Sequence, residues 1–301
     1  MSRHDPTAGR RGSLRGAWWI AALVGMFFVA VAVLQIGEVL KHRGEVGVGD
    51  GKDPATYGYD LSALSVDDRW LAATMPKDNL ESLDRPSLLT PHQVDSLNAA
   101  ERGKYLVPDD RIIGVVVGDE ARAYPVRVMN WHEVANDTLG GVAVAVTWHP
   151  LSGSAVVLRR DELELSVSGL VWNSHHLLHD REQTESLWVP LLATAVLGPQ
   201  QGRNLPLIPC ALTTWGQWRA AYPHTTAPRP ASAMKPAYKR DPYGNYWSGD
   251  TVRYPVSGMQ ESVAGRRLKV GLHEDPIVTT DGLLWARKHG FRFVLEAVAR
   301  P

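Results

Sequence analysis

The hydrophobic residues of this chain are unevenly distributed, and their first concentration lies near the N-terminus. Residues 17–36 form an apolar run without a charged side chain. At the 1.5 Å rise per residue of an α-helix, such a run spans about 30 Å, which matches the hydrocarbon core of a bilayer. Trp18 and Trp19 stand at its start, and tryptophan side chains prefer the membrane interface. The pattern predicts one transmembrane helix, residues 17–40, that lies in the lipid bilayer.

The basic residues around this run predict its orientation. Four arginines precede it, whereas only Lys41 and Arg43 follow closely. Because basic flanks stay in the cytoplasm, we expect residues 1–16 to be a cytoplasmic tail. The protein is then a single-pass protein of the inner membrane with its remainder extracytoplasmic. One alternative is a cleaved signal peptide, but the run is longer than a usual signal core and no Ala-x-Ala sequence follows it. A helix buried in a protein core is the other alternative, and it needs an interior that covers all its sides.

The chain beyond the apolar run reads as a linker followed by one domain. Residues 41–60 are rich in glycine and show no hydrophobic period, so they predict a flexible linker. Residues 61–301 are expected to form a single extracytoplasmic globular domain. Within it, Thr90 and Pro91 predict the start of a helix that ends by Gly103.

From Arg111 onward, short β-branched runs alternate with turn residues. Residues 112–117 and 121–126 flank a Gly-Asp-Glu turn and predict a β-hairpin. Residues 142–147 are apolar on both faces, which predicts an inner strand of a sheet. Residues 162–167 alternate between apolar and polar side chains, which predicts a strand with one face in water. Its expected inward residues are Leu163, Leu165 and Val167, and its expected outward residues are Glu162, Glu164 and Ser166.

Few helices are expected in the domain. Short ones are predicted near residues 128–134, 214–221 and 281–288. Because consecutive strands are joined by tight turns rather than by crossover helices, antiparallel pairing is expected. The predicted fold is therefore β-rich α+β, either a mainly antiparallel sheet or a barrel-like domain with few short helices, preceded by the transmembrane helix.

Composition excludes some classes of function. The 32 Lys and Arg residues balance the 32 Asp and Glu residues, so the chain has no net charge that would attract nucleic acid, and no nucleic-acid partner is expected. The one cysteine, Cys210, excludes an internal disulfide framework and a Cys-x-x-Cys site within the chain.

The densest polar segment, residues 130–141, lies between two predicted strands. It is similar to a His-Glu-x-x-His motif, but Asn136 replaces the second histidine and is a poor zinc ligand, so that motif is not present. His132, Glu133 and Asp137 remain candidates for acid–base catalysis. The alternative is structural: Asn136 and Asp137 cap a helix end and His132 packs in the core.

Two further segments contain histidines. His149 and Ser152 follow the predicted inner strand as a candidate base and nucleophile, although Ser-Gly-Ser is also an ordinary turn sequence. Residues 173–188 contain three histidines, followed by the catalytic candidates Asp180 and Glu185. Imidazole and carboxylate groups suit a divalent metal ion, and exposed histidines on a polar loop are the alternative.

Several long phrases occur in these segments: GDEARAYPVRVMNWHEVANDTLGG, VSGLVWNS, HDREQTESLW, LTTWGQW and RDPYGNYW. Together they cover about residues 107–250. They resemble a bacterial family named only as domain of unknown function 3179. The resemblance implies a domain shared by exported or membrane-anchored bacterial proteins, with no established activity.

One departure from this family concerns the candidate chemistry. Where the family shows a Tyr-Cys-Pro-Leu-Cys phrase, this chain has Trp148-His149-Pro150-Leu151-Ser152. Two thiols at that spacing would suit a metal or redox site. Histidine retains one ligand, whereas serine has little affinity for soft metals, so the resemblance implies an altered or lost function at this phrase.

These observations lead to one hypothesis and one rival. The hypothesis is a polar pocket, formed by His132, Glu133, His149, Asp180 and Glu185, that binds a small ligand or a divalent metal ion. His132 and His149 are the candidate metal ligands, and His132 or Glu185 is the candidate proton acceptor. The rival is a non-catalytic accessory or interaction module of a membrane-associated complex, in which these residues brace loops.

Overall fold

The β-branched runs of the sequence fold into four sheets in the computed structural model, which describes residues 48–100, 104–248 and 253–255. The central sheet has the order β13 (Leu207–Ile208), β8 (Ser154–Arg159), β7 (Val142–His149), β6 (Val134–Leu139) and β2 (Leu83–Asp84). The outer sheet has the order β1 (Leu71–Ala73), β9 (Leu165–Trp172), β10 (His175–Asp180), β11 (Leu187–Val189) and β12 (Thr194–Leu197).

Two smaller sheets and several short helices complete the described part. The three-stranded sheet has the order β14 (Cys210–Thr214), β4 (Arg111–Val117) and β5 (Glu120–Pro125), and the two-stranded sheet pairs β15 (Ala227–Pro228) with β3 (Leu88–Leu89). The α-helices are α2 (Pro91–Ala100), α3 (Val126–Met129), α4 (Trp215–Ala221) and α5 (Gly244–Ser248). The 3₁₀ turns are η2 (Pro54–Tyr57), η3 (Leu61–Ala63), η4 (Asp68–Trp70), η5 (Pro190–Leu192), η6 (Ser232–Met234) and η7 (Ala237–Lys239).

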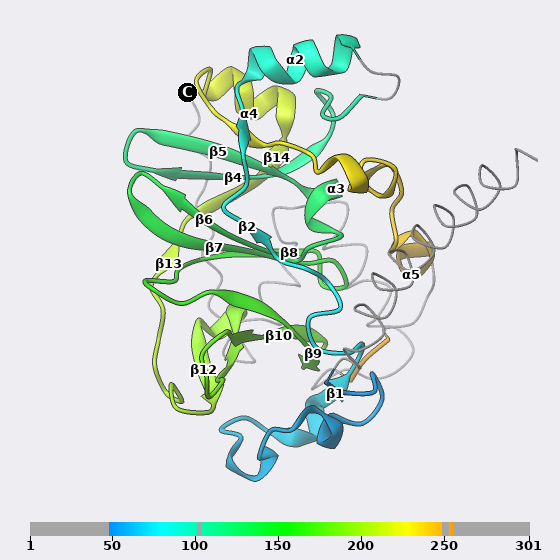
Figure 1. Cartoon of the computed structure of the whole chain (residues 1–301), viewed down its shortest axis with the longest axis vertical. Helices are drawn as coiled ribbons and strands as arrows, with labels where there is room; N and C mark the ends of the chain where they lie inside the picture. The colour runs from blue at the N-terminus through cyan, green and yellow to red at the C-terminus, as the bar shows by residue number, and fades with distance from the viewer. Residues whose placement is uncertain (1–47, 101–103, 249–252, 256–301) are drawn as a thin grey trace, which may run out of the picture. The chain divides into compact units, whose positions relative to one another are not determined.

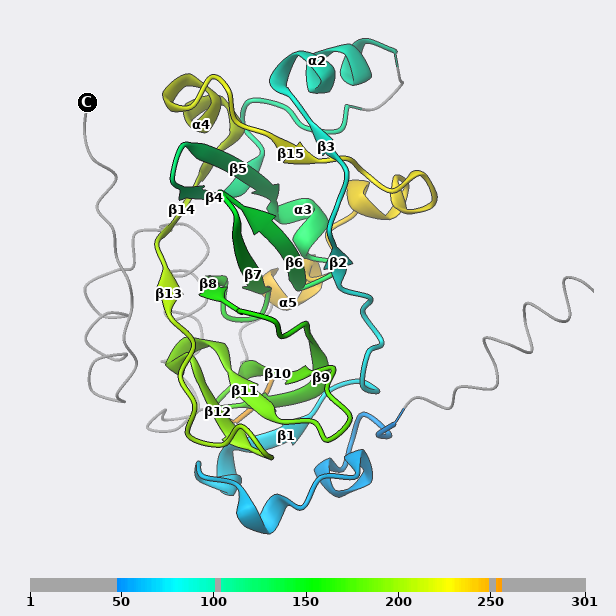
Figure 2. The ribbon, with the colours of Figure 1, turned by 60° about the vertical axis from the view of Figure 1, so that its left-hand side comes forward.

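The sheets lie in layers (Figure 1 and Figure 2). In both views α2 and α4 lie at one end, followed by the three-stranded sheet, the central sheet and the outer sheet. The segment that contains η2, η3 and η4 covers the far face of the outer sheet, where Tyr57 packs against Leu170 and Leu177. The three-stranded sheet covers one face of the central sheet, and the outer sheet covers the other.

Alternation along the central strands explains this burial. In β7, Val144 and Val146 pack toward the three-stranded sheet, whereas Ala145 between them packs toward the outer sheet. Successive side chains of a strand point to opposite faces, so a strand that is apolar at every position can be buried on both sides. β7 is the middle strand of the central sheet, and the predicted inner strand is confirmed.

A buried asparagine joins the central sheet to the outer sheet. The Asn136 side chain donates to the carbonyl of Leu165 at 2.9 Å and accepts from the Leu165 amide at 3.0 Å. It also donates to the Asp84 carboxylate at 2.8 Å. Asn136 is fully buried, so its amide has exchanged water for these partners and fixes β6 against the start of β9.

Several predicted elements are confirmed. The domain is β-rich with mostly antiparallel pairing and few short helices, and the one parallel pair among the described strands joins β2 to β6. β4 and β5 form the predicted hairpin. α2 begins after Thr90, whose hydroxyl accepts from the Gln93 amide, and Thr214 caps α4 in the same way.

The prediction that residues 162–167 form a strand with one face in water holds only before the strand, where Glu162 is exposed and Glu164 is half-buried, and fails within β9. All of β9 except Trp172 is buried, and Ser166, expected to face outward, is 1% exposed. The segment from η2 to β1 covers the face expected to be wet. Apolar and polar residues do alternate in the sequence, but the serine hydroxyls on the second face hydrogen-bond within the protein. Ser168, for example, donates to the Leu177 carbonyl at 2.7 Å.

The predicted helix over residues 128–134 is also wrong. α3 ends at Met129, Glu133 has a left-handed backbone with φ of 56°, and β6 starts at Val134. His132 and Asn136 therefore do not share a helix face, because Asn136 lies on a strand.

Residues 48–60 of the predicted linker are among the described residues. In this stretch Asp53 caps η2, and the buried Tyr57 donates from its hydroxyl to the Met75 carbonyl at 2.5 Å. No helix among the described residues has the length and apolar character needed to cross a bilayer. The predicted transmembrane helix, residues 17–40, and the predicted helix near residues 281–288 lie outside the described residues.

We predict that Asn136→Ala destabilises the domain by about 2 to 4 kcal/mol, because it leaves the Leu165 amide and carbonyl buried without this partner. Urea denaturation of the two proteins measures the difference. Thr138→Ala, at an exposed position of the same strand, is the control and should change stability by less than about 0.5 kcal/mol. Equal effects of the two substitutions would contradict the structural role of Asn136.

Candidate functional site

The turn between α3 and β6 carries two of the predicted site residues, His132 and Glu133. The His132 ring donates from Nδ1 to the Glu81 carbonyl at 2.6 Å, which leaves Nε2 to accept from the Tyr238 hydroxyl at 2.7 Å. Burial lowers the pKa of His132, so the ring is neutral and this tautomer satisfies both nitrogens. His132 is therefore held as a structural histidine in this conformation.

Glu133 points into the protein from a left-handed backbone position, φ 56°. Such a conformation is uncommon for a residue with a side chain and costs roughly 1 kcal/mol or more. Its carboxyl lies 2.9 Å from His176 Nδ1 through Oε2 and accepts from the Tyr243 hydroxyl at 3.0 Å through Oε1. Burial raises the pKa of Glu133 from 4.5 to about 8. The carboxyl consequently holds a proton at neutral pH.

His176, the partner of Glu133, lies near the start of β10. Burial lowers its pKa to about 3, so the ring is neutral. Its Nε2 is buried and has no hydrogen-bond partner among the described residues. A buried polar atom of this kind is rare in folded proteins and calls for a specific explanation.

Three buried rings, His149, His175 and His176, form what we call the histidine cluster. Their ring centroids lie 4.7 to 4.9 Å apart. His175 donates from Nδ1 to the His176 carbonyl at 3.2 Å and accepts at Nε2 from Ser154 at 3.0 Å. His149 Nδ1 lies 3.1 Å from the Ser152 hydroxyl. Burial, and then the neighbouring histidines, hold the pKa of His149 and His175 well below the usual range.

Two local features of the sequence bring these rings together. Asn173 and Ser174 both have positive φ, 55° and 58°, which is the geometry of a two-residue type I′ hairpin turn. The turn places His175 and His176 at the first positions of β10. His149 is the last residue of β7, so a strand end and a hairpin start meet in the core.

The other predicted catalytic carboxylates are engaged elsewhere. Asp137 accepts from Arg122 at 2.7 Å and from the Tyr124 hydroxyl at 2.8 Å, which ties the central sheet to the three-stranded sheet. Asp180 accepts from the Ser186 amide at 2.9 Å and from the Trp188 indole at 3.0 Å. Both are buried with their oxygens satisfied by structural partners, so neither belongs to the cluster.

Glu185 lies in a separate ion-pair group on the outer sheet. It pairs with Lys77 at 2.7 Å, accepts from Tyr59 at 2.9 Å and lies 3.3 Å from His179. His179 also pairs with Asp78 at 2.9 Å. The structure thus brings Glu133 and His149 together through His176 and leaves Asp137, Asp180 and Glu185 apart from them.

The histidine cluster does not present a metal site. Among the described residues, no group of three His, Cys, Asp or Glu side chains is arranged to hold a metal ion. The ring nitrogens face different oxygens, since His149 faces Ser152, His175 faces Ser154 and His176 faces Glu133. His132, the other candidate ligand, has both nitrogens engaged.

A family model described as Protein of unknown function (DUF3179) matches residues 77–282, which is more than half of the chain. The chain belongs to this family. No curated protein and no solved structure matches it. The resemblance noted in the sequence is therefore confirmed.

Residues 148–152, where this DUF3179 chain departs from the family's Tyr-Cys-Pro-Leu-Cys phrase, contribute His149 to the histidine cluster. His149 and Ser152 occupy the positions at which the resemblance places two cysteines, and they are in hydrogen-bond contact at 3.1 Å. His149 is buried and Ser152 is half-buried, so the serine hydroxyl contacts the histidine ring at the edge of the cluster.

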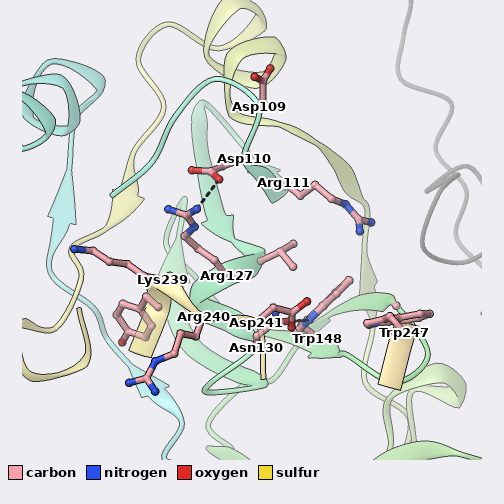
Figure 3. Close-up of a pocket in the computed structure, with 13 residues that line it drawn as sticks. Asp109, Asp110, Arg111, Arg127, Asn130, Trp148, Lys239, Arg240, Asp241 and Trp247 are labelled. Carbon is pink, nitrogen blue, oxygen red and sulfur yellow. Dashed lines mark hydrogen bonds and ion pairs between the residues drawn. The ribbon is translucent and has the colours of Figure 1, made fainter. Parts of the chain in front are cut away.

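A pocket of about 340 Å³ adjoins this part of the DUF3179 domain (Figure 3). Trp148 and Gly153, which lie beside His149 and Ser152 in the chain, line it, as does Tyr238, the partner of His132. Asp241 and Trp247 come from the same segment as Tyr243, which contacts Glu133. The pocket therefore lies near the cluster along the chain, although Glu133, His149, His176 and Tyr243 are not among its lining residues.

Sequence reasoning missed His176 and Tyr243 as partners of Glu133. The signal for His176 was the Asn-Ser pair before His175, which is compatible with a tight hairpin and so with histidines in a buried strand. Tyr243 lies in the RDPYGNYW phrase, but no spacing in the sequence links it to Glu133, 110 residues away.

We predict that Glu133 makes the stability of the domain fall with pH between about 6.5 and 8. The folded pKa of Glu133 is raised, so its contribution is present below its unfolded value of 4.5 and is lost as pH rises through about 8. The cluster histidines have depressed pKa values, so their loss of stability occurs only below 6.5. The slope from one proton is at most about 1.4 kcal/mol per pH unit, or about 2 kcal/mol over this window.

Chemical denaturation at a series of pH values between these limits measures the slope. Glu133→Gln should flatten it, whereas Glu162→Gln, at an exposed position, should leave it unchanged. A wild-type profile with no slope in this window would show that Glu133 is ionised in the folded protein.

Proposed function

We propose that this DUF3179 domain exchanges a proton with a small ligand through Glu133 and His176. The observation that carries the proposal is the hydrogen bond between a buried carboxyl that holds a proton near neutral pH and a neutral histidine whose other nitrogen has no partner among the described residues. Strongly perturbed titratable groups beside a pocket are typical of acid–base sites.

The contrast with Asp137 and Asp180 supports a functional role for Glu133. Those two carboxylates accept several hydrogen bonds each, and their role is to join strands and loops. Glu133 has a strained backbone and raises the free energy of the folded state at alkaline pH. Nothing in the packing requires an ionisable group at this position, since a glutamine could make similar contacts.

The pair has two protonation states that differ at His176 Nε2. In the first state, the protonated Glu133 carboxyl donates a hydrogen bond to His176 Nδ1, and His176 Nε2 carries the ring proton. In the second, Nε2 has given its proton to the ligand, the Glu133 proton has moved to Nδ1, and Nδ1 donates to the carboxylate. One proton leaves in total, and the reverse sequence takes one up. His176 thereby changes from donor to acceptor without moving its ring.

Tyr243 provides the second contact of the pair. Its hydroxyl donates to Glu133 Oε1, and burial keeps the pKa of Tyr243 well above its usual value, so it remains a donor. It stabilises the carboxylate in the second state. Tyr243 comes from the same segment as Asp241 and Trp247, which line the pocket, so this segment connects the pocket to the pair.

We predict that the His176 tautomer switches with an apparent pKa near 8. Selective ¹⁵N-histidine labelling of the full chain in a mild detergent, followed by NMR, distinguishes a protonated from a bare Nε2. Below pH 8 the Nε2 of His176 should be protonated, and above it bare. In Glu133→Gln the tautomer should be the same across the range. A wild-type tautomer that also stays fixed would favour the rival role, an accessory module in which the cluster is purely architectural.

We further propose that the domain works at the extracytoplasmic face of the inner membrane, tethered by residues 17–40. The uncharged run and the arginines before it support this location. Alkaline carbonate should leave the full chain in the membrane fraction, and externally added protease should digest the domain in spheroplasts. Release by carbonate, or a mature protein that starts after residue 40, would contradict the tether.

A further inference from the structure

We propose that the pocket beside the histidine cluster binds a small organic monocarboxylate through Arg111. This assigns a ligand class to the site and rests on the proposed function only for what happens to the ligand after binding. The pocket volume, about 340 Å³, is within the range of small-molecule sites.

Arg111 is the pocket residue whose side chain lacks a hydrogen-bond partner at a buried nitrogen within the described part of the chain, so it is the residue that a ligand would stabilise most. Its Nη2 atom is buried and has no hydrogen-bond partner among the described residues. Burial lowers the pKa of Arg111, and no acidic group acts in the opposite direction. Arg111 as a whole is half-buried, but a guanidinium nitrogen that is buried without a partner is costly, and a planar carboxylate is the partner that fits its geometry best.

The remaining charges of the pocket are largely balanced. Arg127 pairs with Asp110 at 3.0 Å, and Asp241 accepts from the Tyr243 amide at 2.9 Å. Four basic and three acidic side chains line the pocket, so the net charge is one positive. A ligand with a single negative charge balances this better than a dianion such as sulfate.

Aromatic rings lie next to the Arg111 guanidinium. The Arg111 guanidinium carbon is 6.0 Å from the centre of the Trp148 ring, and the Trp148 indole is fixed by its hydrogen bond to Asn130 at 2.7 Å. Figure 3 shows Trp247 on the same side of the pocket as Arg111 and Trp148, while the charged ends of Lys239 and Arg240 point to the other side. A carboxylate on Arg111 would thus have its apolar part between indole rings.

Isothermal titration of the full chain in detergent with benzoate tests the proposal. Benzamide has the same shape without the charge, and inorganic phosphate, mainly a monoanion at pH 6.5, has a tetrahedral instead of a planar geometry. We expect saturable benzoate binding, with benzamide and phosphate at least about tenfold weaker, because one charge-assisted contact accounts for such a factor. No saturable benzoate binding, or tighter binding of phosphate, would overturn the assignment.

Substitution of Arg111 gives the second arm. Arg111→Gln should weaken benzoate binding about tenfold or more, and Arg111→Lys should weaken it less, because lysine keeps the charge but not the planar fork. Arg69→Gln removes the same charge from an exposed site and should bind as wild type. Thermal unfolding should show Arg111→Gln folded and no less stable, because the change removes a buried unpaired charge. Unchanged benzoate binding by Arg111→Gln would refute the role of Arg111.

The two proposals can fail separately. The tautomer switch of His176 is measured without ligand, so a failure of benzoate binding leaves that result intact. Benzoate binding is measured at pH 6.5, where Glu133 retains its proton, so a fixed tautomer does not affect it.

Discussion

The hydrogen bond between Glu133 and His176 is the contact on which the candidate site depends. It joins the turn before β6 of the central sheet to the start of β10 in the outer sheet. In this buried position the carboxyl cannot ionise at low cost, so its pKa rises to about 8 and the neighbouring histidines stay neutral. The same burial that stabilises the domain thus sets the protonation of the site.

The surrounding fold keeps this contact dry and fixed. Asn136 holds β6 against β9 two residues beyond the turn, and the left-handed pair Asn173 and Ser174 directs the histidines inward. Tyr238 and Tyr243 close the site from the segment that also lines the pocket. A ligand bound in that pocket would therefore act on a rigid, preorganised set of groups, which is the usual condition for acid–base chemistry.

The sequence predicts the elements better than their environment. The β-branched and apolar runs identify β4, β5 and β7, because they depend only on which side chains are apolar. Alternation fails for β9, because the cover over its second face comes from residues 54–73, and their packing cannot be read from β9 itself. The helix expected near residues 128–134 fails because α3 ends at Met129 and Glu133 adopts a left-handed backbone conformation.

For the candidate site, too, the sequence predicts the residues but not their environment. Glu133, Asp137 and Asp180 look alike in the sequence, as acidic residues near histidines. Only their partners in space separate them: Arg122 and Tyr124 for Asp137, the Ser186 amide and Trp188 for Asp180, and a neutral histidine for Glu133. Neither a motif nor a spacing carries this information.

The most direct test of the account is the ionisation of Glu133 itself. In the full chain labelled with ¹³C at glutamate carboxyls, the signal that disappears in Glu133→Gln can be followed across the pH range by NMR. The account predicts a midpoint near pH 8. A midpoint close to the ordinary value of 4.5 would contradict it, because the carboxylate would then be charged at neutral pH and could not hold the proton that the site needs.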